Sequence, residues 1–133
     1  SNTKIIMEEK YYIPDISEFK VGFECEKYDM YFNENAPIEE WRIHVIVEED
    51  FNALSNYLSF YRVKYLDSEG IISLGFNFSH DVYVKNCGDR LLSLVTKDDK
   101  IRICEMSNSD KYKVLFYGKI RNKSELKDIL EKI

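Results

Sequence analysis

The sequence predicts an α+β fold: an antiparallel β-sheet with a meander in the C-terminal half, a mid-chain helix and a C-terminal helix. Segments 19–26 and 41–47 alternate apolar and polar residues with the period of two that marks half-buried strands. Turn residues divide the second half of the chain into strands about ten residues apart, the spacing of an antiparallel meander. Segments 50–61 and 124–133 instead repeat apolar residues at three and four, as amphipathic helices do.

The two strands predicted in the N-terminal half each carry one apolar face. We expect these faces to point into the core: Phe19, Val21, Phe23 and Cys25 in the first strand, and Trp41, Ile43, Val45 and Val47, opposite Arg42 and His44, in the second. Between the strands, the Asn- and acid-rich segment Asp29–Pro37 predicts a connecting loop.

The predicted mid-chain helix, 50–61, begins at Asp50, a residue type that caps helix N-termini. Its apolar stripe consists of Phe51, Leu54, Leu58 and Tyr61.

The next segment, 62–66, predicts a short strand. Residues 67–78 fit two structures. They can form a short helix that Gly75 ends after Leu74, or a strand in which Leu74, Phe76 and Phe78 alternate; the helix is preferred up to Leu74.

The meander is predicted to contain strands at 82–86, 91–97, 100–106 and 112–120. A two-residue turn at Asp98-Asp99 would pair Lys97 with Lys100, Thr96 with Ile101, Leu94 with Ile103, and Leu92 with Glu105. One face then holds Leu92, Leu94, Ile101 and Ile103, and the other Leu91, Val95, Cys104 and Met106. Because both faces are apolar, both need cover. We expect a second copy to cover one of them in a homodimer; the alternative is a monomer in which both helices, or segment 67–78, cover it within the chain.

The C-terminal helix has both a start signal and an apolar stripe. Asn122 and Glu125 have the spacing of a capping box, and Leu126, Ile129, Leu130 and Ile133 lie on one side. No linker or repeat divides the chain, so a single domain is predicted over residues 3–133, with Ser1-Asn2 as a tag remnant.

Composition excludes several classes of function. The net charge of −5 argues against a nucleic-acid-binding protein, and no apolar run approaches the length of a membrane span. Cys25, Cys87 and Cys104 are odd in number and widely spaced, which predicts reduced thiols in a cytoplasmic protein. No ligand set for a metal and no phosphate-binding loop is present, so neither a metal nor another cofactor is predicted.

Glu24 and Glu26 are the one candidate catalytic pair, because alternate residues of a strand point to the same face. Two such carboxylates could hold Mg²⁺ for hydrolysis. The alternative, which we prefer, is that they form the polar face of an amphipathic strand without a catalytic role.

Aromatic residues are abundant: ten Tyr, eight Phe and one Trp. Several tyrosines fall outside the predicted core pattern, namely Tyr11, Tyr12, Tyr28 and Tyr31. Tyrosine is enriched at protein interfaces, but an A+T-rich genome would raise its frequency as well, and the sequence leaves both explanations open.

Three stretches resemble small phage and prophage proteins of Bacteroidetes that have no assigned activity: Ile13–Asp15 with Glu18–Glu26, Arg62–Phe76, and Leu115–Leu130. The resemblance implies an accessory protein that acts in the cytoplasm of a bacterial host, and it transfers no catalytic residue. We expect a non-enzymatic protein that binds a host or phage protein. The alternatives are a small-molecule-binding protein, for example one that sequesters a nucleotide, and a metal-dependent hydrolase that uses Glu24 and Glu26.

Overall fold

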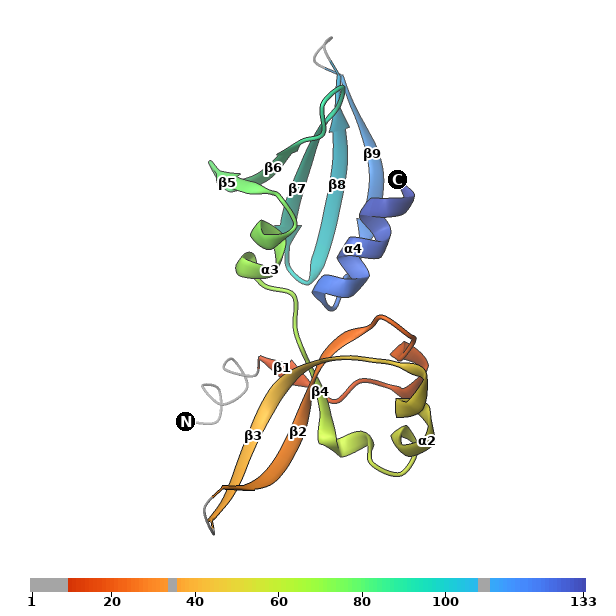
Figure 1. Cartoon of the computed structure of the whole chain (residues 1–133). Helices are drawn as coiled ribbons and strands as arrows, with labels where there is room; N and C mark the ends of the chain where they lie inside the picture. Colours follow the sequence, from red (N-terminus) through yellow and green to blue (C-terminus); the bar gives the residue numbers. More distant parts are fainter. Residues whose placement is uncertain (1–9, 34–35, 108–110) are drawn as a thin grey trace. The chain divides into compact units, whose positions relative to one another are not determined.

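The computed structural model describes residues 10–33, 36–107 and 111–133 (Figure 1). The chain forms two compact units, Ser1–Tyr65 and Leu66–Ile133, and each contains one antiparallel sheet and its own hydrophobic core. The predicted α+β class is confirmed. The single domain predicted over residues 3–133 stays a prediction. Within the described residues, no helix is long and apolar enough to cross a membrane.

The N-terminal unit is built on a four-stranded sheet of order β1-β4-β2-β3. Its strands are β1 (Tyr11–Tyr12), β2 (Glu24–Asn33), β3 (Ala36–Val45) and β4 (Tyr61–Lys64). Short helices connect them: η1 (Ile16–Glu18), η2 (Glu48–Asp50), α2 (Phe51–Leu54) and η3 (Leu58–Phe60). The core on one side of this sheet consists of Phe19, Phe23, Cys25, Ile46, Leu54, Tyr61 and Val63.

The predicted strand 19–26 is displaced along the chain. Phe19, Phe23 and Cys25 are buried as expected, but Val21 is 61% exposed because the chain turns there. Gly22 has φ 93°; its N–H bonds the Ile46 carbonyl, and the Ile46 N–H bonds the Phe23 carbonyl, which makes a glycine bulge at the start of β2. The loop predicted over Asp29–Pro37 is also wrong, since β2 runs to Asn33 and β3 begins at Ala36.

The predicted orientation of the second strand is reversed. The register of β2 and β3 pairs buried Cys25 with His44, so His44 lies on the core side. Alternate residues then point away from the core, and Ile43 is 75% exposed. The apolar row of this strand therefore covers the outer face of the sheet.

The predicted helix 50–61 is present only as the four-residue α2, followed by η3. Asp50 does not cap α2, because its carboxylate instead accepts the Val47 N–H at 2.8 Å, one turn earlier. Leu54 is fully buried and Leu58 packs against the core, whereas Phe51 is exposed.

The C-terminal unit contains a five-stranded meander of order β5-β6-β7-β8-β9. Its strands are β5 (Asn77–Ser79), β6 (Val82–Asn86), β7 (Leu91–Lys97), β8 (Lys100–Met106) and β9 (Tyr112–Gly118). The predicted hairpin register is confirmed at every pair from Lys97 with Lys100 to Leu92 with Glu105. The core comprises Ile71, Phe76, Tyr83, Leu92, Leu94, Ile101, Ile103, Ile120 and Leu126.

Both predictions for segment 67–78 are partly correct. Helix α3 (Ser68–Ser73) begins at Asp67, whose carboxylate accepts the Gly70 N–H, and it ends at Leu74 before Gly75 at φ 101°. The chain then enters β5 as a strand.

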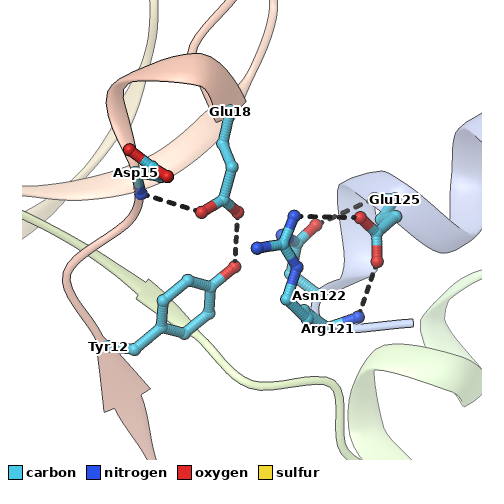
Figure 2. A network of polar contacts seen from close by, with 6 residues as sticks. All are labelled: Tyr12, Asp15, Glu18, Arg121, Asn122 and Glu125. Atoms are coloured by element: carbon cyan, nitrogen blue, oxygen red, sulfur yellow. Dashed lines mark hydrogen bonds and ion pairs between the residues drawn. The ribbon is translucent and has the colours of Figure 1, made fainter. Parts of the chain in front are cut away.

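The C-terminal helix forms as α4 (Lys123–Lys132), and its start is confirmed. The Asn122 side chain accepts the Glu125 N–H at 2.8 Å (Figure 2). The Glu125 carboxylate accepts the backbone N–H of Arg121 at 2.7 Å, one residue before the predicted partner. The stripe also holds: Leu126 is fully buried, and Ile129, Leu130 and Ile133 pack against the core.

Candidate functional site: an arginine–aromatic surface on the N-terminal sheet

The outer face of the N-terminal sheet gathers aromatic residues of β1, β2, β3 and η3 around Arg62 of β4. Strand register sets this arrangement, because Glu26 lies opposite both Arg62 on β4 and Ile43 on β3, and Tyr28 lies opposite Trp41. We call this the Arg62 surface; its residues are Tyr11, Glu26, Tyr28, Trp41, Ile43, Val45, Phe60 and Arg62.

Arg62 lies between two aromatic rings. Its guanidinium carbon is 3.8 Å from the ring centroid of Tyr11 and 4.3 Å from that of Trp41. The carboxylate of Glu26 accepts from the same guanidinium, with Nε at 2.9 Å and Nη2 at 2.8 Å from Oε1. Both side chains are about a quarter exposed, at 27% and 23%. The guanidinium is thus fixed by π-contacts on its faces and by a carboxylate at its edge.

The aromatic contacts continue from Trp41 across the sheet. The rings of Trp41 and Tyr28 are 5.2 Å apart, and Tyr28 stacks on Phe60 at 6.2 Å and 14°. Phe60 in turn contacts Tyr57 at 5.9 Å. Beside them, the apolar side chains of Ile43 and Val45 are 75% and 49% exposed.

This composition is that of a binding surface. Trp, Tyr and Arg are the residue types that contribute most to protein–protein affinity, and they do so best when they are rigid and flanked by apolar area. In the Arg62 surface the ring contacts and the Glu26 ion pair restrict the arginine before any partner arrives, so little side-chain entropy remains to be lost on binding.

The two glutamates singled out in the sequence differ in surroundings. Glu24 is exposed, whereas Glu26 is half-buried and bonded to Arg62. A metal bound between them would have to compete with this guanidinium for Glu26. Within the residues that the structure describes, no three His, Cys, Asp or Glu side chains cluster as metal ligands.

A polar cluster occupies the core side of the same sheet. His44 Nε2 and Asp50 Oδ2 are 2.9 Å apart, and Tyr61 donates a hydrogen bond to Asp50. Burial alone would raise the pKa of Asp50, but bonds from the Val47 N–H and from His44 outweigh it and hold that pKa below its ordinary value. Burial, and then the negative charge of Asp50, raise the pKa of the Tyr61 hydroxyl.

Cys25 borders this cluster, because it pairs with His44 in the register of β2 and β3. Burial, followed by the charges of Asp50, Glu24 and Glu26, raises the pKa of the Cys25 thiol to about 12. The thiol is therefore protonated at neutral pH and is a poor nucleophile. The cluster combines Cys, His and Asp, but its chemistry is that of a structural network.

The tyrosines outside the predicted core pattern have different locations. Tyr11 and Tyr28 belong to the Arg62 surface. Tyr12 lies on the core side, stacks on Tyr65 at 4.7 Å and donates its hydroxyl to Glu18 at 2.8 Å (Figure 2). The side chain of Tyr31 lies outside the described residues. The sequence does not identify Arg62, Trp41 and Ile43 as residues of a binding surface. The only indication in the sequence is that Tyr11 and Tyr28 lie outside the predicted core pattern.

Within the part of the chain that the structure describes, the C-terminal unit packs its helices on one face of the sheet, which leaves an outer face. The residues of α3 and α4 that pack on this sheet join the core of its inner face. On the outer face Leu91, Met106 and Val114 are exposed by 37%, 38% and 49%. Register places Lys97, Lys100 and Arg102 on this face as well. The predicted second apolar face is therefore present; it carries basic side chains.

Comparisons of this chain with protein families, with curated proteins and with solved structures find no match.

Proposed function

We propose that this chain is a non-enzymatic protein that acts by binding another protein through the Arg62 surface. The observation that carries the proposal is the Arg62 guanidinium, held between the Tyr11 and Trp41 rings and paired with Glu26. About a quarter of the Arg62 side chain remains exposed while the two rings and the Glu26 carboxylate hold it in place, so the guanidinium is ordered before a partner binds.

The surface offers a partner two kinds of contact. Ile43 and Val45 provide apolar area that water covers in the free protein. The ordered rings of Trp41 and Tyr28 provide large, rigid contact area at a small entropic cost. We expect a partner that presents an apolar patch to Ile43 and hydrogen-bond acceptors to the edge of the Arg62 guanidinium.

The setting that we propose is that of a phage or prophage accessory protein in a bacterial host. It comes from the sequence resemblance alone, and the geometry of the Arg62 surface does not depend on it.

Affinity capture tests the proposal. The full chain is immobilised and exposed to lysate of a Bacteroidetes host, and the captured proteins are quantified by mass spectrometry. We expect one partner in stoichiometric amount, with capture reduced at least about tenfold by Ile43→Asp and by Arg62→Ala, as for hot-spot residues. The captured protein is then purified, and its affinity for each variant is measured by calorimetry.

Ile16→Asp is the matched control, because Ile16 is also an exposed isoleucine of the N-terminal unit (46%) and lies outside the Arg62 surface. Circular dichroism establishes that each variant is folded. If Ile43→Asp, Arg62→Ala and Ile16→Asp bind a partner equally well, the Arg62 surface is not the binding site.

A further inference from the structure

Strand β3 is an unusual sheet edge. It lies at the end of the strand order β1-β4-β2-β3, is ten residues long and pairs with β2 without a register shift (Figure 1). The other edge strands that the structure describes are protected. β1 and β5 have two and three residues, and β9 is interrupted by a bulge opposite Ile103 and Cys104. Long, regular edges are the ones that pair with further strands.

The backbone of β3 has groups available for such pairing. Ile46 donates its N–H to the Phe23 carbonyl on the β2 side. In an antiparallel ladder alternate residues face the partner, so Trp41, Ile43 and Val45 direct their N–H and C=O groups toward the open edge. Pro37 falls in the same outward series but has no N–H to donate, so the part of the edge available to a further strand is the part that follows it.

The charges of β3 are self-complementary. Glu39 and Glu40 precede Trp41, and Arg42 and His44 follow it. A two-fold axis at Trp41 would place Glu40 opposite Arg42 of the second copy, twice. An axis at Arg42 would oppose two arginines and would place Glu40 opposite His44, whose ring is already bonded to Asp50. An axis at Ile43 would oppose Arg42 and His44. The axis at Trp41 therefore forms two Glu–Arg pairs without opposing like charges, and it makes the pair of Trp41 residues a hydrogen-bonded one.

We infer that two copies of this chain associate by antiparallel pairing of their β3 strands, centred on Trp41. The occupant is a second copy because the edge complements its own charge sequence; β9, the next longest edge, has Lys113 and no acidic residue between Tyr112 and Gly118. The pairing extends the four-stranded sheet into one continuous sheet of two copies. It uses a different surface from the outer face of the meander, whose basic side chains Lys97, Lys100 and Arg102 would repel their equivalents.

Charge-reversal variants test this register. In one copy the Arg42 Nε and a Glu40 oxygen are 3.0 Å apart, and both side chains are about half exposed, at 56% and 43%. Arg42→Glu and Glu40→Arg each give positions 40 and 42 the same charge. Like charges then lie on one strand and also face each other between the two copies. We expect the wild-type chain to have twice its 15.8 kDa mass by multi-angle light scattering at micromolar concentration, and each variant to dissociate with a constant raised at least about tenfold.

An equimolar mixture of the two variants isolates the contact between copies. Each variant alone lacks the Glu40–Arg42 pair within its own strand, but together they restore both pairs across the axis. The mixture should therefore return to twice the monomer mass. A monomeric wild-type chain overturns the inference, and so does a dimer that both single variants leave unchanged. Neither result affects the Arg62 surface, since Glu40 and Arg42 point to the opposite side of the sheet.

Discussion

Asp50 links three parts of the N-terminal unit through one carboxylate. It accepts the backbone N–H of Val47, lies 2.9 Å from His44 Nε2 and accepts the hydroxyl of Tyr61 on β4. Its side chain is almost fully buried, so each of these bonds replaces hydration that the carboxylate loses on folding. A buried carboxylate with three donors stabilises the unit mainly because its removal would leave those donors unsatisfied.

Replacing Asp50 should therefore destabilise the protein and alter its response to acid. Asp50→Ala should cost about 2–3 kcal/mol at pH 7, a typical value for hydrogen bonds to a charged group. Because folding lowers the pKa of Asp50, its contribution is complete above the unfolded value of about 3.9 and is lost as the pH falls through the lower folded value.

Urea denaturation at pH 7 and pH 3, followed by circular dichroism, measures this effect. Asp50→Asn is the matched variant, since it retains an acceptor for Val47 but cannot ionise. The wild-type chain should lose more stability than Asp50→Asn between the two pH values. An equal loss would show that the carboxylate charge contributes nothing.

For individual residues, the sequence predicts that a strand has an apolar and a polar face better than it predicts which of the two faces points into the core. His44 and Ile43 show the reason: in the sequence Ile43 is the better core residue, but the register of β2 and β3 pairs His44 with buried Cys25. A local alternation cannot reveal which of its two faces is inward when another part of the fold, here Asp50 of η2, supplies a buried partner for the polar residue.

Among the elements, those of the C-terminal unit follow from local signals. The Asp98-Asp99 turn fixes the register of β7 and β8, and Asn122 with the apolar stripe fixes α4. The N-terminal elements depend on distant contacts instead. In the β2–β3 hairpin, pairing continues beyond Asp29 to Asn33, although the Asn and acidic residues of this segment favour a loop. Helix α2 begins without a side-chain cap, because Asp50 bonds Val47 and His44 rather than the start of the helix.

Helix α4 offers a direct test of packing at the scale of the element. Leu126 is fully buried in the core of the C-terminal unit, whereas the adjacent Lys127 is exposed. Leu126→Ala should cost about 2–5 kcal/mol, since it removes transfer free energy and leaves a cavity. Lys127→Ala should change stability by less than about 0.5 kcal/mol. Thermal melts decide the matter, and similar melting temperatures for the two variants would contradict the docking of α4.

For the whole molecule, the sequence predicts the α+β class but not the two compact units into which the chain folds. Strand β4 ends at Lys64 and α3 begins at Ser68, so the boundary between the units falls in a short segment without the glycine or proline typical of linkers. Each unit has a core that the apolar pattern anticipates in part. The pattern alone does not show that these side chains form two clusters. Periodicity shows which side of a strand or helix is apolar, but it does not show which other element that side packs against.

The three cysteines report on both units in one experiment. Cys87 is exposed, whereas Cys25 and Cys104 are buried. A thiol reagent such as Ellman's should modify Cys87 rapidly in the native protein, and the other two only as the chain unfolds, with Cys25 further slowed by its pKa of about 12. Three thiols should be counted in denaturant without reductant. Two fast thiols in the native protein, or fewer than three in denaturant, would contradict this expectation.

The chain has a single tryptophan, and it is the one that contacts Arg62. Intrinsic fluorescence excited at the indole therefore originates in the N-terminal unit alone, from a ring flanked by a cation and by Tyr28. A change in emission on adding a partner would come from the Arg62 surface without any introduced label. The same signal, followed in the Leu126→Ala chain, would show whether a lesion in a unit that has no tryptophan is felt by the other, and so whether the two cores melt together.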